Sequence, residues 1–295
     1  LAYPAAYGGT DNMPAYAAIF EHMMFVDGSM AVKFGVQFGL FGGSIQKLGT
    51  KKHHDTYLLE TGKANLLGCF AMTETGHGSN VRGVKTTATY DRETDSIIIH
   101  TPGKNDNKEY IGNALHSTMA TVFAQLIVDG KNHGVHAILV TIRDTEHNLM
   151  PGVTIEDNGY KLGLNGVDNG KIWFHQVQVP RENLLNKNYA NISILLNKYG
   201  DISPEGVYHS AIENPSKRFF TMLGTLVGGR ICVARAGLGG AKKALTIAVK
   251  YALQRRQFND SIKVQEDLLM DYPSHQLRLT PAIASCYVYD VTLTH

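Results

Sequence analysis

The sequence predicts an α+β protein of several domains: an N-terminal helical segment, a central antiparallel β-barrel or β-sandwich, and the truncated start of a C-terminal helical bundle. Two observations predict this class. Apolar residues recur at helical spacing near both ends of the chain, and short β-branched runs separated by turn residues occupy the middle. Strands and helices do not alternate, which argues against a doubly wound α/β fold. The predicted segments are residues 1–66 (helical), 67–182 (strands), 183–213 (linker) and 214–295 (helical).

The composition is that of a globular protein. The 295 residues are 43% hydrophobic and 18% charged. Lys and Arg number 28 against 26 Asp and Glu, so the net charge of +2 does not predict nucleic-acid binding. The three cysteines, Cys69, Cys232 and Cys286, form no CxxC pair, which argues against a disulfide framework or a structural zinc site. No run approaches the ~18–20 apolar residues of a membrane span, so none is expected.

Two helices are predicted before the strands. The first begins at Pro14, a residue suited to the first helical turn, and Ile19, Met23 and Val26 share one of its faces. The second helix is predicted over residues 29–48. Gly49 follows it as a natural terminator.

The central region is predicted to form β-hairpins. "TTATYD" and "SIIIH" are β-branched runs separated by "DRETD", and "TVFAQLIV" is followed after a short loop by "GVHAILVTI". Several short strands at this spacing predict a small barrel or sandwich. The second pair is joined by a loop that contains Asp129, Gly130 and Asn132, and further turns are predicted at Asn158-Gly159 and Asn169-Gly170.

A further helix is predicted from Asn214. Its side chain can cap the helix, and Pro215 suits the first helical position. Phe219, Met222 and Leu226 recur at helical spacing, and the glycines and alanines that follow allow close packing against neighbouring helices.

The stretch "CFAMTETGHGSN", residues 69–80, is the candidate ligand-binding segment. A buried strand opens here into a polar loop, where backbone N–H groups and threonine hydroxyls can donate to a ligand and glycines let it approach closely. An ordinary polar turn is the alternative. His77 lies alone between glycines and is assigned no proton transfer. His53 and His54 lack an HExxH pattern, so no metal site is expected.

Three motifs in the same order resemble the acyl-CoA dehydrogenase superfamily and, within it, the acyl-CoA oxidases. The superfamily's flavin loop is matched by Phe70, Met72, Thr73, Glu74, Gly76, Gly78 and Ser79. Gly76-His77-Gly78, Arg82-Gly83 and "TTATYD" are typical of the oxidase branch. "YALQRRQF", residues 251–258, is similar to a third superfamily motif.

The resemblance implies that residues 67–182 bind FAD and acyl-CoA. Thr73 and the Met72 backbone would meet the flavin with Phe70 nearby, and Ser79 would touch the acyl-CoA. Gly112 aligns with a second flavin-contact glycine of the oxidases, where dehydrogenases usually carry Trp-x-Thr; a simple turn glycine is the alternative.

The resemblance also assigns roles in the last segment. Arg255 would reach the FAD pyrophosphate of a neighbouring subunit, which implies a homodimer, and a guanidinium fork suits a diphosphate. Phe258 would pack beside the same cofactor, and Arg230 matches an arginine on the substrate side. A solvated arginine at a helix end is the alternative for Arg255.

The implied reaction is the FAD-dependent α,β-dehydrogenation of acyl-CoA to trans-2-enoyl-CoA in fatty-acid β-oxidation, with O2 reduced to H2O2. The family's base is a glutamate beside a Gly-Gly pair, expected beyond His295, so none of the residues 1–295 is expected to be the catalytic base. Glu74 matches a framework glutamate. The chain begins at Leu1 and is expected to be incomplete at both ends.

Two other functions stay open. One is an acyl-CoA dehydrogenase that passes electrons to a separate acceptor, and the other is a non-catalytic remnant that keeps the fold. The expected compartment is the peroxisome for a eukaryotic protein and the cytoplasm for a bacterial one.

Overall fold

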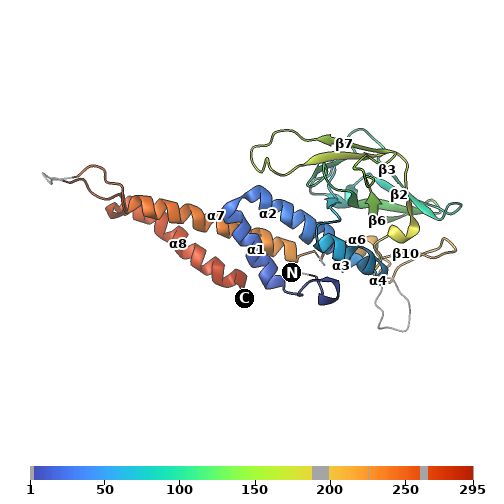
Figure 1. Ribbon diagram of the computed structural model, residues 1–295, viewed down its shortest axis with the longest axis horizontal. Coiled ribbons are helices and arrows are strands. Elements are labelled where there is room, and N and C mark those ends of the chain that lie inside the picture. Colours follow the sequence, from blue (N-terminus) through green and yellow to red (C-terminus); the bar gives the residue numbers. More distant parts are fainter. Residues whose placement is uncertain (1–2, 188–198, 225, 260–264, 295) are drawn as a thin grey trace. The chain divides into compact units, whose positions relative to one another are not determined.

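The computed structural model describes residues 3–187, 199–224, 226–259 and 265–294. Helices precede and follow a region of strands, which confirms the predicted α+β class (Figure 1). The chain forms two compact units, each with its own packing. The first comprises residues 1–12 and 32–229, and the second comprises residues 13–31 and 230–295.

Helical turns fill most of the first 62 residues. The predicted helix starting near Pro14 is confirmed as α1, and the second predicted helix is confirmed as a continuous helical run that ends before Gly49. Gly49 leaves the helix with extended backbone, and its N–H donates to the Ile45 carbonyl at 2.9 Å. The elements are α1 (Met13–Val26), α2 (Gly28–Phe34), π-helix η2 (Gly35–Phe41), α3 (Gly42–Leu48), α4 (Lys51–His53), π-helix η3 (His54–Leu58) and α5 (Leu59–Gly62).

The buried face of α1 differs from the apolar face seen in the sequence. Tyr16, Ala17 and Phe20 are buried, whereas Val26 is 77% exposed. The prediction used only the large aliphatic and sulfur side chains of α1. The buried face of the helix is instead formed by alanine and aromatic side chains, which that pattern did not include.

The π-helix η2 places an amide side chain against the first strand. Gln37 is buried, and its Nε2 donates to the carbonyls of Thr61 at 3.3 Å and Leu66 at 2.8 Å. Its Oε1 accepts from the Gly68 N–H at 2.9 Å. The wider turn of a π-helix changes the direction in which its side chains point. Here it lets Gln37 hydrogen-bond to the start of β1, the strand that leads to the candidate site.

Among the described residues, the strands form one large and two small sheets. The large sheet has the order β1-β5-β2-β3-β9, with β6 paired to β5. Its strands are β1 (Gly68–Ala71), β2 (Thr87–Asp91), β3 (Ser96–His100), β5 (Met119–Val128), β6 (Lys131–Thr141) and β9 (Val177–Pro180). The others are β4 (Lys108–Ile111), β8 (Gly170–Phe174) and β7 (Val153–Asp157) in that order, and β10 (Asp201–Ile202) with β11 (Tyr208–His209).

The two predicted hairpins are confirmed as β2–β3 and β5–β6. Asp129 and Gly130, with φ of 48° and 73°, form the two-residue turn that the right-handed twist of paired strands favours. The two later turn signals instead mark the ends of one loop. The Asn158 N–H donates to the Asn169 carbonyl at 3.0 Å, and the chain between them joins β7 to β8.

The large sheet is mixed rather than purely antiparallel. β5 runs parallel to both β1 and β2, while the remaining pairs are antiparallel. Parallel neighbours need a long connection between them, and the segments that separate β1 and β2 from β5 provide one.

Strand β5 is buried on both faces. Ala120, Val122 and Leu126 join a core that the large sheet shares with the β4-β8-β7 sheet. The alternate residues Met119 and Phe123 join a second core beneath the η2 and α3 helices. Successive side chains of a strand point to opposite faces, so this one strand lies at the centre of both cores.

The predicted cap before the last helical region is confirmed. The Asn214 Oδ1 accepts from the Lys217 N–H at 3.0 Å. The helix predicted from Asn214 is, however, two helices, with Leu226 in a turn between them. The remaining elements are α6 (Pro215–Gly224), α7 (Gly228–Ala252), α8 (Pro273–Thr294) and the short 3-10 helices η1 (Ala5–Tyr7), η4 (Val81–Gly83), η5 (Arg181–Asn183) and η6 (Leu269–Asp271).

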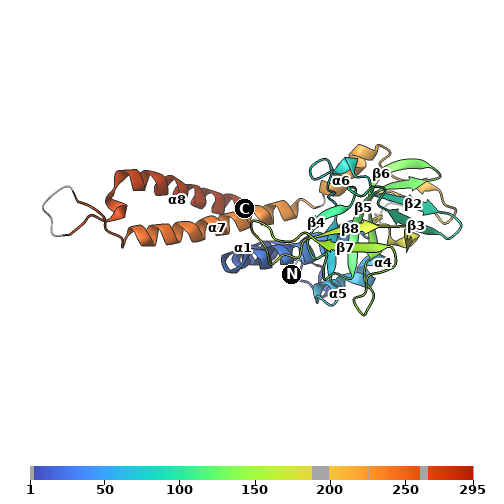
Figure 2. The same ribbon diagram turned by 90° about the horizontal axis from the view of Figure 1, so that it is seen from above.

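Helices α7 and α8 lie side by side in the second unit (Figure 2). Lys242 of α7 donates to Asp290 of α8 at 2.6 Å and to Glu21 of α1 at 2.9 Å, and Arg235 also donates to Glu21 at 2.9 Å. Glu21 is buried, so this ion cluster joins α1, α7 and α8.

The predicted linker and the membrane-span prediction can be compared with the structure only for the described residues. Residues 188–198 of the predicted linker lie outside the described residues. Within the described ranges, no single helix has the length and apolar character to cross a membrane, although α6 and α7 taken together as a bent pair would meet that test.

Candidate functional site

The end of β1 lies against the segment that contains β4. The Thr73 hydroxyl donates to the Glu109 carbonyl at 2.8 Å, and the Glu109 N–H donates back to the Thr73 carbonyl at 3.1 Å. Nearer the start of β1, the Asn113 Nδ2 donates to the Gly68 carbonyl at 3.1 Å. These contacts bring the predicted loop residues and Gly112 onto two adjacent segments of one unit.

An ion pair lies beneath this strand end. The side chains of Glu74 and Lys108 are completely buried, with the Lys108 Nζ 3.0 Å from the Glu74 Oε1. The Glu74 carboxylate also accepts from the N–H groups of Lys85 at 2.6 Å and Thr86 at 3.0 Å, and from the Thr86 hydroxyl at 2.6 Å. Lys108 also donates to the carbonyls of Met72 at 3.1 Å and Phe123 at 2.6 Å.

Burial and pairing act in opposite directions on these two groups. Burial alone would raise the pKa of Glu74, but the Lys108 charge and the bonds from Thr86 and Lys85 hold this pKa below its usual value. Burial lowers the pKa of Lys108 to about 8, against the raising effect of Glu74. Both groups are therefore charged at neutral pH. A buried carboxylate with all these partners belongs to the framework of the loop and is not available as a base.

The loop after Glu74 is open to solvent. A Cβ atom added at Gly76 or Gly78 would meet nothing within 4 Å, and Ser79 is exposed. The Thr75 hydroxyl donates to Asn107 at 2.9 Å, and the His77 N–H donates to the Glu74 carbonyl at 2.9 Å. The loop is thus anchored at its start and leaves its glycines and Ser79 accessible to a ligand.

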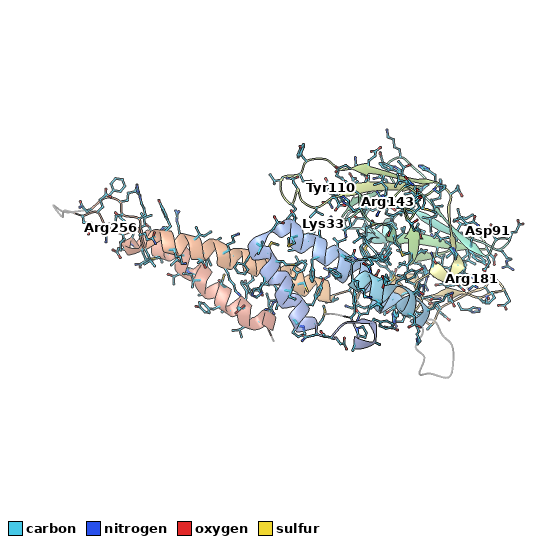
Figure 3. All side chains as sticks on the ribbon, in the orientation of Figure 1. Lys33, Asp91, Tyr110, Arg143, Arg181 and Arg256 are labelled. Carbon is cyan, nitrogen blue, oxygen red and sulfur yellow. The ribbon has the colours of Figure 1, made fainter. Side chains whose placement is uncertain are left out.

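Gly112 packs closely against Val36, whereas the nearby side chain of Tyr110 is exposed. A Cβ added at Gly112 would lie 3.0 Å from the Val36 Cγ2, which is closer than ordinary contact. Tyr110 has a left-handed backbone with φ of 58° and is 65% exposed (Figure 3). Residues other than glycine adopt this conformation uncommonly, and the sequence carried no signal for it beyond the aromatic residue beside Gly112.

A buried carboxylate holds the turn that follows Gly112. Asp168 accepts from the Leu115 N–H at 3.2 Å and from the His116 Nδ1 at 2.8 Å, and it pairs with Lys33 of α2. Burial would raise the pKa of Asp168, but these partners lower it. On the other side, Arg143 donates to the carbonyls of Ala114 and Ser117 at 2.8 and 2.7 Å. Sequence reasoning missed all of these residues because their partners are remote in the chain.

Arg230, Arg255 and Phe258 belong to the second unit, and their predicted roles stay predictions. Arg255 is exposed just beyond α7, and its carbonyl accepts from the Leu269 N–H at 2.9 Å. Phe258 is 72% exposed and has a left-handed φ of 56°. Arg230 is exposed near the start of α7. None of these three side chains is buried, so each is free to meet a ligand or a second subunit.

The site in the first unit suits a flat ring system that accepts hydrogen bonds. Phe70 and Met72 are half-buried and Tyr110 is exposed, which offers apolar surface for a ring. The hydroxyl and carbonyl of Thr73 are engaged with Glu109, so the backbone N–H is the donor of this residue left for a ligand. Within the described residues, no group of three or more His, Cys, Asp or Glu side chains could hold a metal ion. The fully buried Cys69 has its pKa raised to about 12 by burial and is inert.

Two family models match the chain. Residues 69–177 match the acyl-CoA dehydrogenase middle domain, which contains the site just described. Residues 223–295 match the acyl-CoA oxidase C-alpha1 domain.

Individual relatives and solved structures agree with these models. The chain is 44% identical over 271 residues to the peroxisomal acyl-coenzyme A oxidase 3 of Arabidopsis thaliana, covering 92% of this chain and 38% of the relative. The crystal structure of acyl-CoA oxidase 3 from Yarrowia lipolytica superposes with a TM-score of 0.80 at 38% identity, covering 93% of this chain and 38% of that one. Acyl-CoA oxidase-2 of Caenorhabditis elegans, bound with FAD, ascaroside-CoA and ATP, superposes with a TM-score of 0.77 at 31% identity, covering 87% of this chain and 37% of that one. The chain thus spans about two fifths of the length of the proteins it matches.

Proposed function

We propose that the chain is part of an acyl-CoA oxidase: it binds FAD and belongs to an enzyme that oxidises acyl-CoA to trans-2-enoyl-CoA in fatty-acid β-oxidation, with O2 reduced to H2O2. One observation carries the proposal. The end of β1 and the segment around Gly112, which the family resemblance assigns to the flavin, are held together by the paired hydrogen bonds between Thr73 and Glu109. The donor set and the apolar side chains there fit a flavin ring.

FAD supplies the redox chemistry when bound, and the residues of this chain position it and exclude water. The Thr73 N–H and the Met72 backbone would hold the flavin, and Phe70 would lie nearby. Preorganised donors of this kind stabilise the negative charge that reduction brings, because they need no reorganisation at the moment of reaction. The exposed Ser79 contacts the acyl-CoA on the other side of the loop. No residue of this chain is assigned as the base.

The remaining residues complete the cofactor site across a homodimer. Arg255 binds the FAD pyrophosphate of a neighbouring subunit, Phe258 packs beside that cofactor, and Arg230 lies on the substrate side. Their exposure in the second unit supports these roles. The substrates are acyl-CoA and O2. The compartment is the peroxisome if the protein is eukaryotic, which the names of the relatives support, and the cytoplasm if it is bacterial.

The test is an oxygen-electrode assay of the full-length gene product with an acyl-CoA substrate and no added electron acceptor. Stoichiometric H2O2 and enoyl-CoA are the expected products. Activity that depends on an added electron-transfer flavoprotein would make the protein a dehydrogenase. A purified protein without flavin absorbance, and without flavin uptake on titration, would make it a non-catalytic relative.

A further inference from the structure

The completely buried Glu74–Lys108 pair has a location that stability does not explain. Taking two charges out of water is costly, and apolar side chains of similar volume usually fill such a space with equal or better stability. The pair nevertheless lies directly beneath the strand end that carries the candidate flavin contacts. All its partners are backbone groups or the buried Thr86 hydroxyl.

The Lys108 ammonium has three donors, and each has an acceptor. One lies on the carboxylate of Glu74, one on the Phe123 carbonyl in β5 and one on the Met72 carbonyl at the end of β1. Lys108 is itself in β4, so a single cation joins β1, β4 and β5 at the point where β1 opens into the loop. A neutral or shorter side chain could not make all three contacts.

The contact to Met72 determines the direction of the next donor. The peptide bond between Met72 and Thr73 is planar and trans, so its N–H points opposite to its carbonyl. Since Lys108 holds the Met72 carbonyl toward the interior, the Thr73 N–H points away from the interior. The second contact pair, between Thr73 and Glu109, fixes the other side of the same residue.

We propose that Lys108 and Glu74 are positioning residues for the cofactor: Lys108 orients the Met72–Thr73 peptide so that the Thr73 N–H meets the flavin ring, and Glu74 keeps Lys108 charged and in place. This inference rests on the flavin site proposed above. A donor held rigidly before reduction stabilises the reduced ring more than the oxidised ring, because the reduced ring carries more negative charge. The pair therefore raises the reduction potential of the bound flavin.

The experiment compares the full-length wild-type gene product with its double variant Glu74→Gln/Lys108→Met, which removes both charges and leaves neither unpaired. FAD affinity is measured by fluorescence titration, the two-electron midpoint potential by dye equilibration, and folding by circular dichroism. We expect affinity for reduced flavin to fall about tenfold further than affinity for oxidised flavin, the worth of one hydrogen bond. That difference equals a fall of about 30 mV in the midpoint potential.

The matched control is Asp95→Asn/Arg181→Met. This pair, with the Arg181 Nε 2.7 Å from the Asp95 Oδ1, lies in the same unit but beside β3 and β9, at the edge of the sheet opposite β1. Figure 3 shows Arg181 well separated from Tyr110 of the candidate site. The control variant should keep the wild-type midpoint potential even where its thermal stability falls.

The outcomes separate the two proposals. A folded double variant with the affinity and midpoint potential of the wild type overturns the positioning role and leaves the proposed function standing. A full-length wild-type protein that takes up no FAD overturns both. If the double variant does not fold, Glu74→Asp decides the question, because it keeps both charges and withdraws the carboxylate by one methylene. Its midpoint potential should fall in the same direction, and an unchanged potential refutes the inference.

Discussion

Protonation of His136 is expected to destabilise the β-strand unit in mild acid. This residue of β6 is only 3% exposed. Its Nδ1–H donates to the Gly134 carbonyl at 2.9 Å, and its Nε2 accepts from the Tyr208 hydroxyl at 2.9 Å, so the ring is held neutral. Burial, with a smaller contribution from the nearby Arg218 charge, lowers the pKa of His136 to about 3.

The sign and size of the effect follow from linkage. A histidine whose pKa is lowered on folding stabilises the protein fully above the pKa of the unfolded chain, about 6.5, and this stability is lost as the pH falls toward the folded pKa. Each pH unit within that window corresponds to about 1.4 kcal/mol. Between pH 6.5 and pH 5, His136 should therefore remove about 2 kcal/mol from the free energy of unfolding.

The assay is urea unfolding followed by the fluorescence of Trp173, the one tryptophan of the sequence, which lies in β8 of the same unit. The wild type is compared at pH 7 and pH 5 with His136→Gln, which keeps an acceptor for Tyr208 but cannot gain a proton. The exposed His175 provides the control variant, His175→Gln. The reasoning is refuted if His136→Gln loses as much stability between the two pH values as the wild type does.

Three substitutions test other contacts of the structure. Gly112→Ala should lower the free energy of unfolding of the first unit by about 1–3 kcal/mol, because the new Cβ meets Val36 at 3.0 Å; tryptophan fluorescence during urea unfolding checks this, and an unchanged midpoint would contradict it. Gln37→Leu should cost about 1–3 kcal/mol by the same measurement, because the buried Gly68 N–H loses its acceptor; an equally stable variant would show that this bond is dispensable. Glu21→Gln should destabilise the second unit by about 3 kcal/mol, because Arg235 and Lys242 lose the carboxylate that they share. Circular dichroism of the helices during heating measures this effect, and a variant as stable as the wild type would rule it out.

Local signals in the sequence predicted most of the secondary structure. Asp129-Gly130 predicted its hairpin because only residues that tolerate positive φ make such a turn. Asn214 and Pro215 predicted a helix start, and a capping side chain needs only its own neighbours in the chain. The split between α6 and α7 and the loop from Asn158 to Asn169 were missed, because the same residue types also occur in helices and in tight turns.

Some residues of the candidate site were likewise predicted from the sequence, and others were missed. The loop from Met72 to Ser79 could be recognised because its residues are consecutive, and their types and order suffice to suggest a ligand-binding loop. Tyr110 was missed because its backbone conformation depends on the bulge of β4 against β8, which no local pattern encodes.

The sequence by itself therefore determined which segments are helices and strands, where a ligand-binding loop begins, and which family the chain resembles. Only the tertiary structure decided that Lys108 lies beneath Met72 and pairs with the buried Glu74, and that Asp168 holds the turn after Gly112. The physical reason is that propensities, caps and turns act between residues near in the chain. Buried charges and their hydrogen bonds instead depend on which distant strands and helices the packing of the core brings together.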